Sequence, residues 1–90
     1  MLPKNREPTH PGEMLQEEFL TPRGMSQVEL ARRMGVPVQR INTLIKGKRG
    51  MTAETALLLA EVLETSPESW MSLQSAYDLW HAKRNLRRAG

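Results

Sequence analysis

The sequence contains no cysteine among its 90 residues. Neither a disulfide framework nor a thiolate zinc site can therefore form, and nothing indicates an oxidising compartment. No apolar run approaches the roughly 20 residues that a membrane-spanning helix needs. The first residues also lack the apolar stretch of a signal peptide. We therefore expect one small cytoplasmic domain with no membrane association.

The sequence is also poor in groups that could catalyse a reaction. Its two histidines, His10 and His81, lie at opposite ends of the chain. Glu17 and Glu18 are adjacent on a predicted helix, so their side chains point about 100° apart and form no carboxylate pair. The glycines match no phosphate-binding loop. We therefore expect no catalytic residues, no metal and no cofactor, and the protein is not predicted to be an enzyme.

Basic residues are unevenly distributed, although the net charge is only +3. The stretch 30–53 holds six lysines and arginines and no acid, and the C-terminal tail holds four more. A local basic patch is typical of a phosphate-binding surface. A solvated helix face would have the same composition, so charge alone leaves both interpretations open.

Five helices and no strand are predicted, chiefly from the residues at the helix ends. Capping side chains and first-turn prolines mark the starts, and glycines mark most of the ends. The first helix is predicted to begin at Pro11, capped by His10 and Glu13, and to end at Pro22 and Gly24. The second begins at Ser26, in a capping box with Glu29, and ends at Gly35, and the third begins at Pro37, its first helical position, and ends at Gly47. The fourth begins at Thr52 and the fifth at Ser66–Pro67.

The segment 26–46 has the pattern of a helix-turn-helix. Ala31 lies where two helices approach closely, Gly35 lies in the turn, and Ile41 faces inward from the second helix. A small residue, a glycine four later and an aliphatic residue six after that fit two helices joined steeply by a short turn. The outer face of the second helix is thereby left free for a partner.

The polar side chains of that outer face suit the major groove of DNA. Arginine can bind guanine bidentately, glutamine can bind adenine, and a threonine methyl can contact thymine. We expect base contacts from residues near the start of the helix, namely Val38, Gln39, Arg40 and Thr43. We expect phosphate contacts from Gln27, Asn42, Lys46, Lys48 and Arg49.

Several motifs resemble one family. They follow in order as His10-Pro11-Gly12-Glu13, Ser26-Gln27-x-Glu29-Leu30-Ala31, Arg40-Ile41-Asn42, Gly47-Lys48-Arg49-Gly50 and Thr65-Ser66-Pro67-Glu68-x-Trp70-Met71-x-Leu73-Gln74. Together they resemble the HigA (VapI) antitoxins of toxin–antitoxin systems over residues 10–80. The resemblance implies an all-α, five-helix Cro/C1-type (lambda-repressor-like) fold, a homodimer that represses its own operon, and neutralisation of a HigB-type, mRNA-cleaving toxin.

The chain divides into three parts in this interpretation. Residues 1–9 form a flexible arm, 10–69 the DNA-binding domain, and 70–90 a C-terminal helix with a basic tail. An apolar stripe on that last helix extends beyond the reach of the other four helices. Because a large apolar face on a small chain often marks a partner site, we expect a dimer contact at Tyr77, Leu79 and Trp80.

A toxin would have to bind away from the DNA-contacting helix if the complex is to repress. The first helix carries an acidic strip of Glu13, Glu17 and Glu18. A ribonuclease is expected to be basic, so opposite potentials would favour this surface, unless the glutamates are only a solvated face.

Two alternatives remain open: a helical protein-interaction module, and a plain transcriptional regulator with no toxin partner. The absence of a large apolar anchor from the recognition face favours DNA over a protein partner there.

Overall fold

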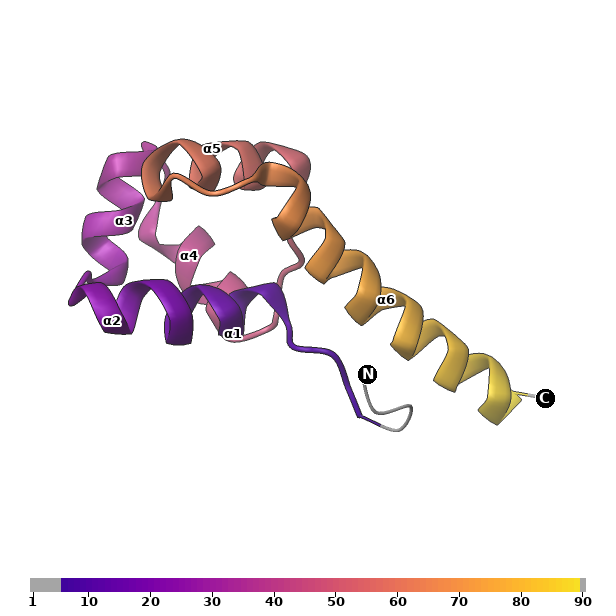
Figure 1. Cartoon of the computed structure of the whole chain (residues 1–90). Coiled ribbons are helices and arrows are strands. Elements are labelled where there is room, and N and C mark those ends of the chain that lie inside the picture. The colour runs from indigo at the N-terminus through magenta and orange to yellow at the C-terminus, as the bar shows by residue number, and fades with distance from the viewer. Residues whose placement is uncertain (1–5, 90) are drawn as a thin grey trace.

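The computed structural model describes residues 6–89, and all of its regular structure within that range is helical (Figure 1). The elements are α1 (Pro11–Leu15), η1 (Gln16–Leu20), α2 (Thr21–Arg23), α3 (Gln27–Met34), α4 (Val38–Ile45), α5 (Ala53–Leu63) and α6 (Pro67–Ala89). Since α1, η1 and α2 form one continuous rod, the described residues form the five helices expected of a Cro/C1-type domain. None of the described helices is both long enough and apolar enough to cross a bilayer.

The first rod begins as predicted but contains a segment that the sequence did not indicate. The ring Nδ1 of His10 accepts a hydrogen bond from the N–H of Gly12 at 2.9 Å, which caps the helix. Residues 16–20 widen into a π-helix just before Pro22. Proline lacks an N–H, and its ring would clash with a carbonyl in a regular turn, so the wider turn gives it room. The prediction that Pro22 ends the helix was therefore wrong. Arg23 is still helical, and Gly24 ends the rod with φ of +62°.

The two helices of the motif begin and end close to the predicted residues. The Oγ of Ser26 accepts from the N–H of Glu29, which caps α3, and Gly35 ends it with φ of +71°. The reciprocal half of the predicted capping box is replaced, because the Glu29 carboxylate binds two arginines instead. Pro37 is the N-cap of α4 rather than its first residue, so that helix begins one position later than predicted.

A single apolar core lies between the five helices. Its members share an exposure of 6% or less: Leu15, Leu20, Leu30, Ala31, Met34, Ile41, Leu44, Met51, Ala56, Leu59, Leu63 and Trp70. Ala31 and Ile41 belong to it, as the helix-turn-helix pattern requires. Because the side chains of α4 that pack in this core are Ile41 and Leu44, the opposite face of the helix is available to solvent.

Gly12 allows the first rod to approach α4 at backbone distance. A Cβ added at Gly12 would lie 1.9 Å from the carbonyl oxygen of Leu44 and 2.9 Å from the Cα of Ile45. No side chain fits in that space, so the helix that carries the predicted DNA contacts rests directly on α1. This contact sets how far α4 can sink into the domain.

Helix α6 begins inside the domain and ends outside it. Trp70 is 2% exposed, and its indole N–H donates to the Oγ1 of Thr65 at 2.8 Å. Beyond this anchor the helix projects from the other helices (Figure 1), although Gln74, Tyr77 and His81 still contact residues outside it. Leu79 and Leu86 on the projecting part are 60% and 73% exposed. The projection explains how a small domain comes to be 45 Å long but only 26 and 20 Å across.

We predict that Gly12→Ala destabilises the protein by about 3 kcal/mol or more, because the added methyl meets backbone that cannot rotate away. Such a loss lowers the midpoint of thermal unfolding by more than about 10 °C in a domain of this size. Gly24→Ala is the matched control. Nothing lies within 4 Å of its added Cβ, although φ is +62°, so only the left-handed backbone opposes it, at about 1 kcal/mol. Equal midpoints for the two variants would contradict the proposed close contact.

Candidate nucleic-acid interface

The outer face of α4 presents the side chains predicted to contact bases, to different extents. Val38 and Gln39, in its first turn, are exposed, whereas Arg40 and Thr43 are half-buried. The hydroxyl of Thr43 donates to the backbone carbonyl of Gln39 at 2.8 Å. That bond turns the hydroxyl toward the backbone and leaves the methyl group as the part that a thymine could contact.

Arg40 is held by an acid from another helix. Its Nη1 lies 2.8 Å from the Oε1 of Glu54, in the first turn of α5. Glu54 is largely exposed, with 71% of its side chain accessible, whereas the accessible fraction for Arg40 is 29%. The guanidinium therefore leans across toward α5 rather than standing outward from α4. To contact a base, Arg40 has to share its five donors between Glu54 and the DNA.

The two helices of the motif are joined by an amide pair. The Nδ2 of Asn42 donates to the Oε1 of Gln27 at 3.2 Å, so the start of α3 is tied to the outer face of α4. This bond leaves the Gln27 amide nitrogen available as a donor. It lies at an N-terminus where the helix dipole favours an anion. The structure thus brings together two of the predicted phosphate-contacting residues.

The other three lie in the segment after α4, which we call the basic loop (residues 46–50). The N–H of Gly47 donates to the carbonyl of Leu44 and that of Lys48 donates to the carbonyl of Thr43, the pattern of a Schellman motif. Gly47 takes φ of +75°, which few other residues adopt without strain. Lys46, Lys48 and Arg49 are exposed, and within residues 6–89 none of them forms an ion pair.

Charge counting along the sequence overestimated the basic patch, because acids just outside the stretch fold back onto it. Glu29 contacts Arg32 at 2.6 Å and Arg33 at 2.7 Å. The hydrogen bond from Arg32, followed by that from Arg33, lowers the pKa of Glu29 to about 2. With Arg40 paired to Glu54, three of the six cations are partly neutralised. The positive charge of the stretch 30–53 is thereby concentrated in the basic loop.

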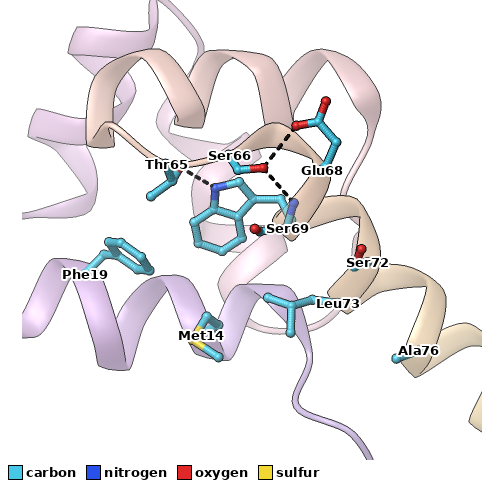
Figure 2. A pocket seen from close by; sticks show the side chains of 10 residues that line it. Met14, Phe19, Thr65, Ser66, Glu68, Ser69, Ser72, Leu73 and Ala76 are labelled. Carbon is cyan, nitrogen blue, oxygen red and sulfur yellow. Dashed lines mark hydrogen bonds between the residues drawn. The ribbon is translucent and has the colours of Figure 1, made fainter.

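A second surface lies between the first rod and α6, and Figure 2 shows it as an apolar groove. Its volume is about 700 Å³, and Met14, Phe19 and Leu73 line it. The Phe19 ring lies 5.3 Å from the ring of Trp70, so the floor of the groove belongs to the core. Glu13, Glu17 and Glu18 of the predicted acidic strip are all exposed on this rod, but none of them lines the groove, whose one acidic lining residue is Glu68. Glu13 instead shares a hollow with Lys46 and Gly47. The sequence indicated the acids but not the groove.

The residues predicted for a dimer contact divide between two environments on α6. Tyr77 is half-buried within its own chain, with its ring 4.8 Å from that of His10 and 4.4 Å from that of His81. Trp80 is partly covered by the guanidinium of Arg84, 5.2 Å from its ring centre. Leu79 lies in the open. Tyr77 is therefore already used to attach the end of the arm, whereas Leu79 remains available to a partner.

The N-terminal arm reaches α6 through charged and aromatic contacts. The Oε2 of Glu7 lies 2.5 Å from the Nε2 of His81. Burial lowers the pKa of His10, which favours the neutral ring that can accept the capping hydrogen bond. The part of the predicted arm at residues 1–5 lies outside the described residues. Across residues 6–89, no cluster of three acidic or histidine side chains could hold a metal ion.

The geometry agrees with that of known proteins. A family model described as Helix-turn-helix matches residues 16–70. Virulence-associated protein I of Dichelobacter nodosus is 43% identical over 91% of this chain and 77% of its own length. The structure titled antitoxin GraA superposes with a TM-score of 0.87 at 41% identity, over 90% of this chain and 87% of that one. Pseudomonas aeruginosa antitoxin HigA, solved with the higBA promoter, gives 0.87 at 36% identity, over 92% and 90%.

Proposed function

The chain belongs to the HigA family of antitoxins, with a Cro/C1-type helix-turn-helix, and we propose that it represses its own toxin–antitoxin operon and neutralises a HigB-type, mRNA-cleaving toxin. This is a family of DNA-binding regulators rather than of enzymes. One observation carries the DNA-binding part of the proposal: the outer face of α4 is followed directly in the chain by the exposed cations of the basic loop, which have no acid partner among residues 6–89. A HigA relative with this fold has been solved on its promoter.

In the proposed complex, α4 enters the major groove and its exposed first turn contacts the bases. Gln39 presents its amide to an adenine, while Val38 and the methyl of Thr43 contact thymine methyl groups. Arg40 reaches a guanine from beside Glu54. Because the carboxylate restricts the guanidinium, Arg40 is predicted to contribute specificity more than affinity.

Phosphates on both sides of the groove would hold the helix in place. Gln27 and Asn42 contact the backbone near the start of α3, and Lys46, Lys48 and Arg49 contact it beyond the end of α4. The three cations of the basic loop, which form no ion pair within residues 6–89, give six in a dimer. Counterion release then predicts a log–log salt slope of about −5 for operator binding.

A gel-shift assay on the DNA upstream of the gene tests this surface. We predict that Lys48→Ala weakens binding to every duplex alike and makes the salt slope shallower, because it removes a phosphate contact. Arg40→Ala is predicted to cost about 1–3 kcal/mol per half-site on the operator and little on random DNA, because it removes a base contact. If Arg40→Ala changes operator and random DNA equally, Arg40 is a phosphate contact and the base contacts rest on Gln39 and Thr43.

We propose that a second copy of the chain covers the projecting part of α6. Two-fold symmetry would place two recognition helices about 34 Å apart, one turn of DNA, on a pseudo-palindromic site. The exposed leucines support this arrangement, since a C2 interface buries one patch against its own copy. They also move the centre of the proposed interface from Tyr77, which packs on His10, to Leu79 and Trp80.

Two single substitutions separate the faces of α6. We predict that Leu79→Glu, which places a charge on the exposed face, converts the dimer to monomer in sedimentation equilibrium. Trp80→Glu weakens the dimer in proportion to how much of the indole the partner covers. Ser75→Ala, an exposed change on the same helix, is the matched control. A dimer that survives both glutamates would place the interface on another element.

We propose that the toxin binds on the side of the first rod, away from α4. The apolar groove offers Phe19, Met14 and Leu73 as a floor and has Glu68 in its lining, and the exposed Glu17 and Glu18 add negative charge to the same rod. A basic ribonuclease would be steered there by charge and held by apolar contact. In this arrangement toxin and operator occupy separate surfaces, so the antitoxin could bind both at once.

Pull-down of the neighbouring gene product tests the toxin surface. We predict that changing Glu13, Glu17 and Glu18 together to lysine lowers toxin affinity at least tenfold, or about 1.4 kcal/mol, by reversing the charge of the strip. Operator binding by the same triple variant serves as the folding control. Unchanged toxin affinity would remove the first rod from the interface. Loss of toxin on Gln39→Ala instead would mean that toxin and DNA compete for α4.

A further inference from the structure

A residue of α6 holds the basic loop from behind. The Oε1 of Gln74 accepts a hydrogen bond from the backbone N–H of Met51 at 2.6 Å, across 23 positions of sequence. Met51 is the first residue after the basic loop, and its side chain is 4% exposed. Gln74 thus supplies an acceptor to a backbone N–H that is turned away from solvent.

The amide of Gln74 is itself oriented by a neighbour on the same helix. Its Nε2 donates to the Oδ1 of Asp78, one turn along, at 2.9 Å. With the nitrogen committed to a carboxylate, the oxygen has to face the Met51 N–H, so only one orientation of the amide satisfies both partners. The side chain is therefore a fixed strut rather than a flexible contact.

The basic loop is thereby fixed at both ends. The Schellman motif at Gly47 and Lys48 holds its start, and the Met51–Gln74 bond holds its finish. Gly50 lies directly on the strut, since a Cβ there would come 3.2 Å from the Gln74 amide. Between these two points stand Lys48 and Arg49, whose exposed side chains have no acid partner among the described residues. The position of their Cα atoms depends on both anchors.

We propose that Gln74 is a positioning residue for DNA binding: it acts through the basic loop, without touching DNA, to place Lys48 and Arg49 against the phosphates. The inference rests on the proposed function and extends it, because it joins the operator surface to the helix that is proposed to form the dimer. Leu79 and Trp80 follow Gln74 within two turns of α6. A partner on that helix is therefore mechanically connected to the phosphate contacts.

The first test compares Gln74→Leu, which keeps the volume of the side chain but removes the acceptor, with Ser75→Ala as the control on the same helix. We expect Gln74→Leu to weaken operator binding about tenfold, as expected for the loss of a hydrogen bond that orders a loop in each half-site. The salt slope should become shallower, by as much as about 3.6 if all four such cations of the dimer lose their phosphate contacts, since the two loop cations of each protomer lose their fixed positions. Wild-type affinity and slope in Gln74→Leu would overturn the proposal.

A double-mutant cycle separates positioning from a general loss of stability. In a background that already carries Lys48→Ala and Arg49→Ala, Gln74→Leu should weaken operator binding less than about twofold, because the contacts that it positions are gone. A full tenfold effect in that background would show that Gln74 acts elsewhere and would overturn the proposal. Gln74→Asn, whose shorter chain cannot reach Met51, replaces Gln74→Leu if the leucine variant does not fold.

A measurement without DNA checks the strut itself. Amide hydrogen exchange of Met51 in the full chain should lose its protection in Gln74→Leu and keep it in Ser75→Ala. Retained protection in Gln74→Leu would overturn the proposal. Different results would contradict the proposed function and the proposed role of Gln74. The proposed function is contradicted if the wild-type protein does not bind the operator, or if Lys48→Ala leaves operator binding unchanged. Normal dependence on Lys48 with no dependence on Gln74 contradicts only this inference.

Discussion

The contact between Gly12 and the carbonyl of Leu44 determines where the recognition helix can lie. Two backbones touch there with no side chain between them, so α4 is as deep in the domain as a helix can be. The depth is what lets Ile41 and Leu44 fill the core from one side of a short helix while its other side stays free. Every proposed base contact depends on that division of one eight-residue helix into two faces.

Local chemistry made much of the fold predictable from the sequence. Capping by His10, Ser26 and Thr52 needs only a side-chain acceptor near its own helix start, and all three caps form as predicted. The left-handed glycines that end α3 and lie within the basic loop are equally local. The π-helical turn before Pro22 was missed, because it resolves a steric conflict that the pattern of apolar residues does not display.

The candidate site was less predictable, because its details depend on residues far apart in the chain. The predicted face of α4 is solvent-facing, but the pairing of Arg40 with Glu54 crosses from one helix to another. The hydrogen bond between Gln74 and Met51 joins residues 23 positions apart in the sequence, compared with 14 for Arg40 and Glu54. A count of charges over residues 30–53 excludes both Glu29 and Glu54 by one position at each end, and so treated three arginines as free. Which individual side chains contact bases, phosphates or a toxin remains a prediction.

The length of α6 has a consequence for how the protein behaves at different concentrations. Its 23 residues span about 35 Å, yet its last hydrogen bond to another segment among the described residues is that of His81 with Glu7, and the outer turns carry Leu86, which is 73% exposed. A helical segment without tertiary contacts is marginally stable in water. If a second copy covers those turns, their order and the stability of the whole chain increase with the amount of protein present. A cell that makes few copies would then hold an antitoxin with frayed outer turns, open to proteases at the end farthest from the DNA-contacting surface.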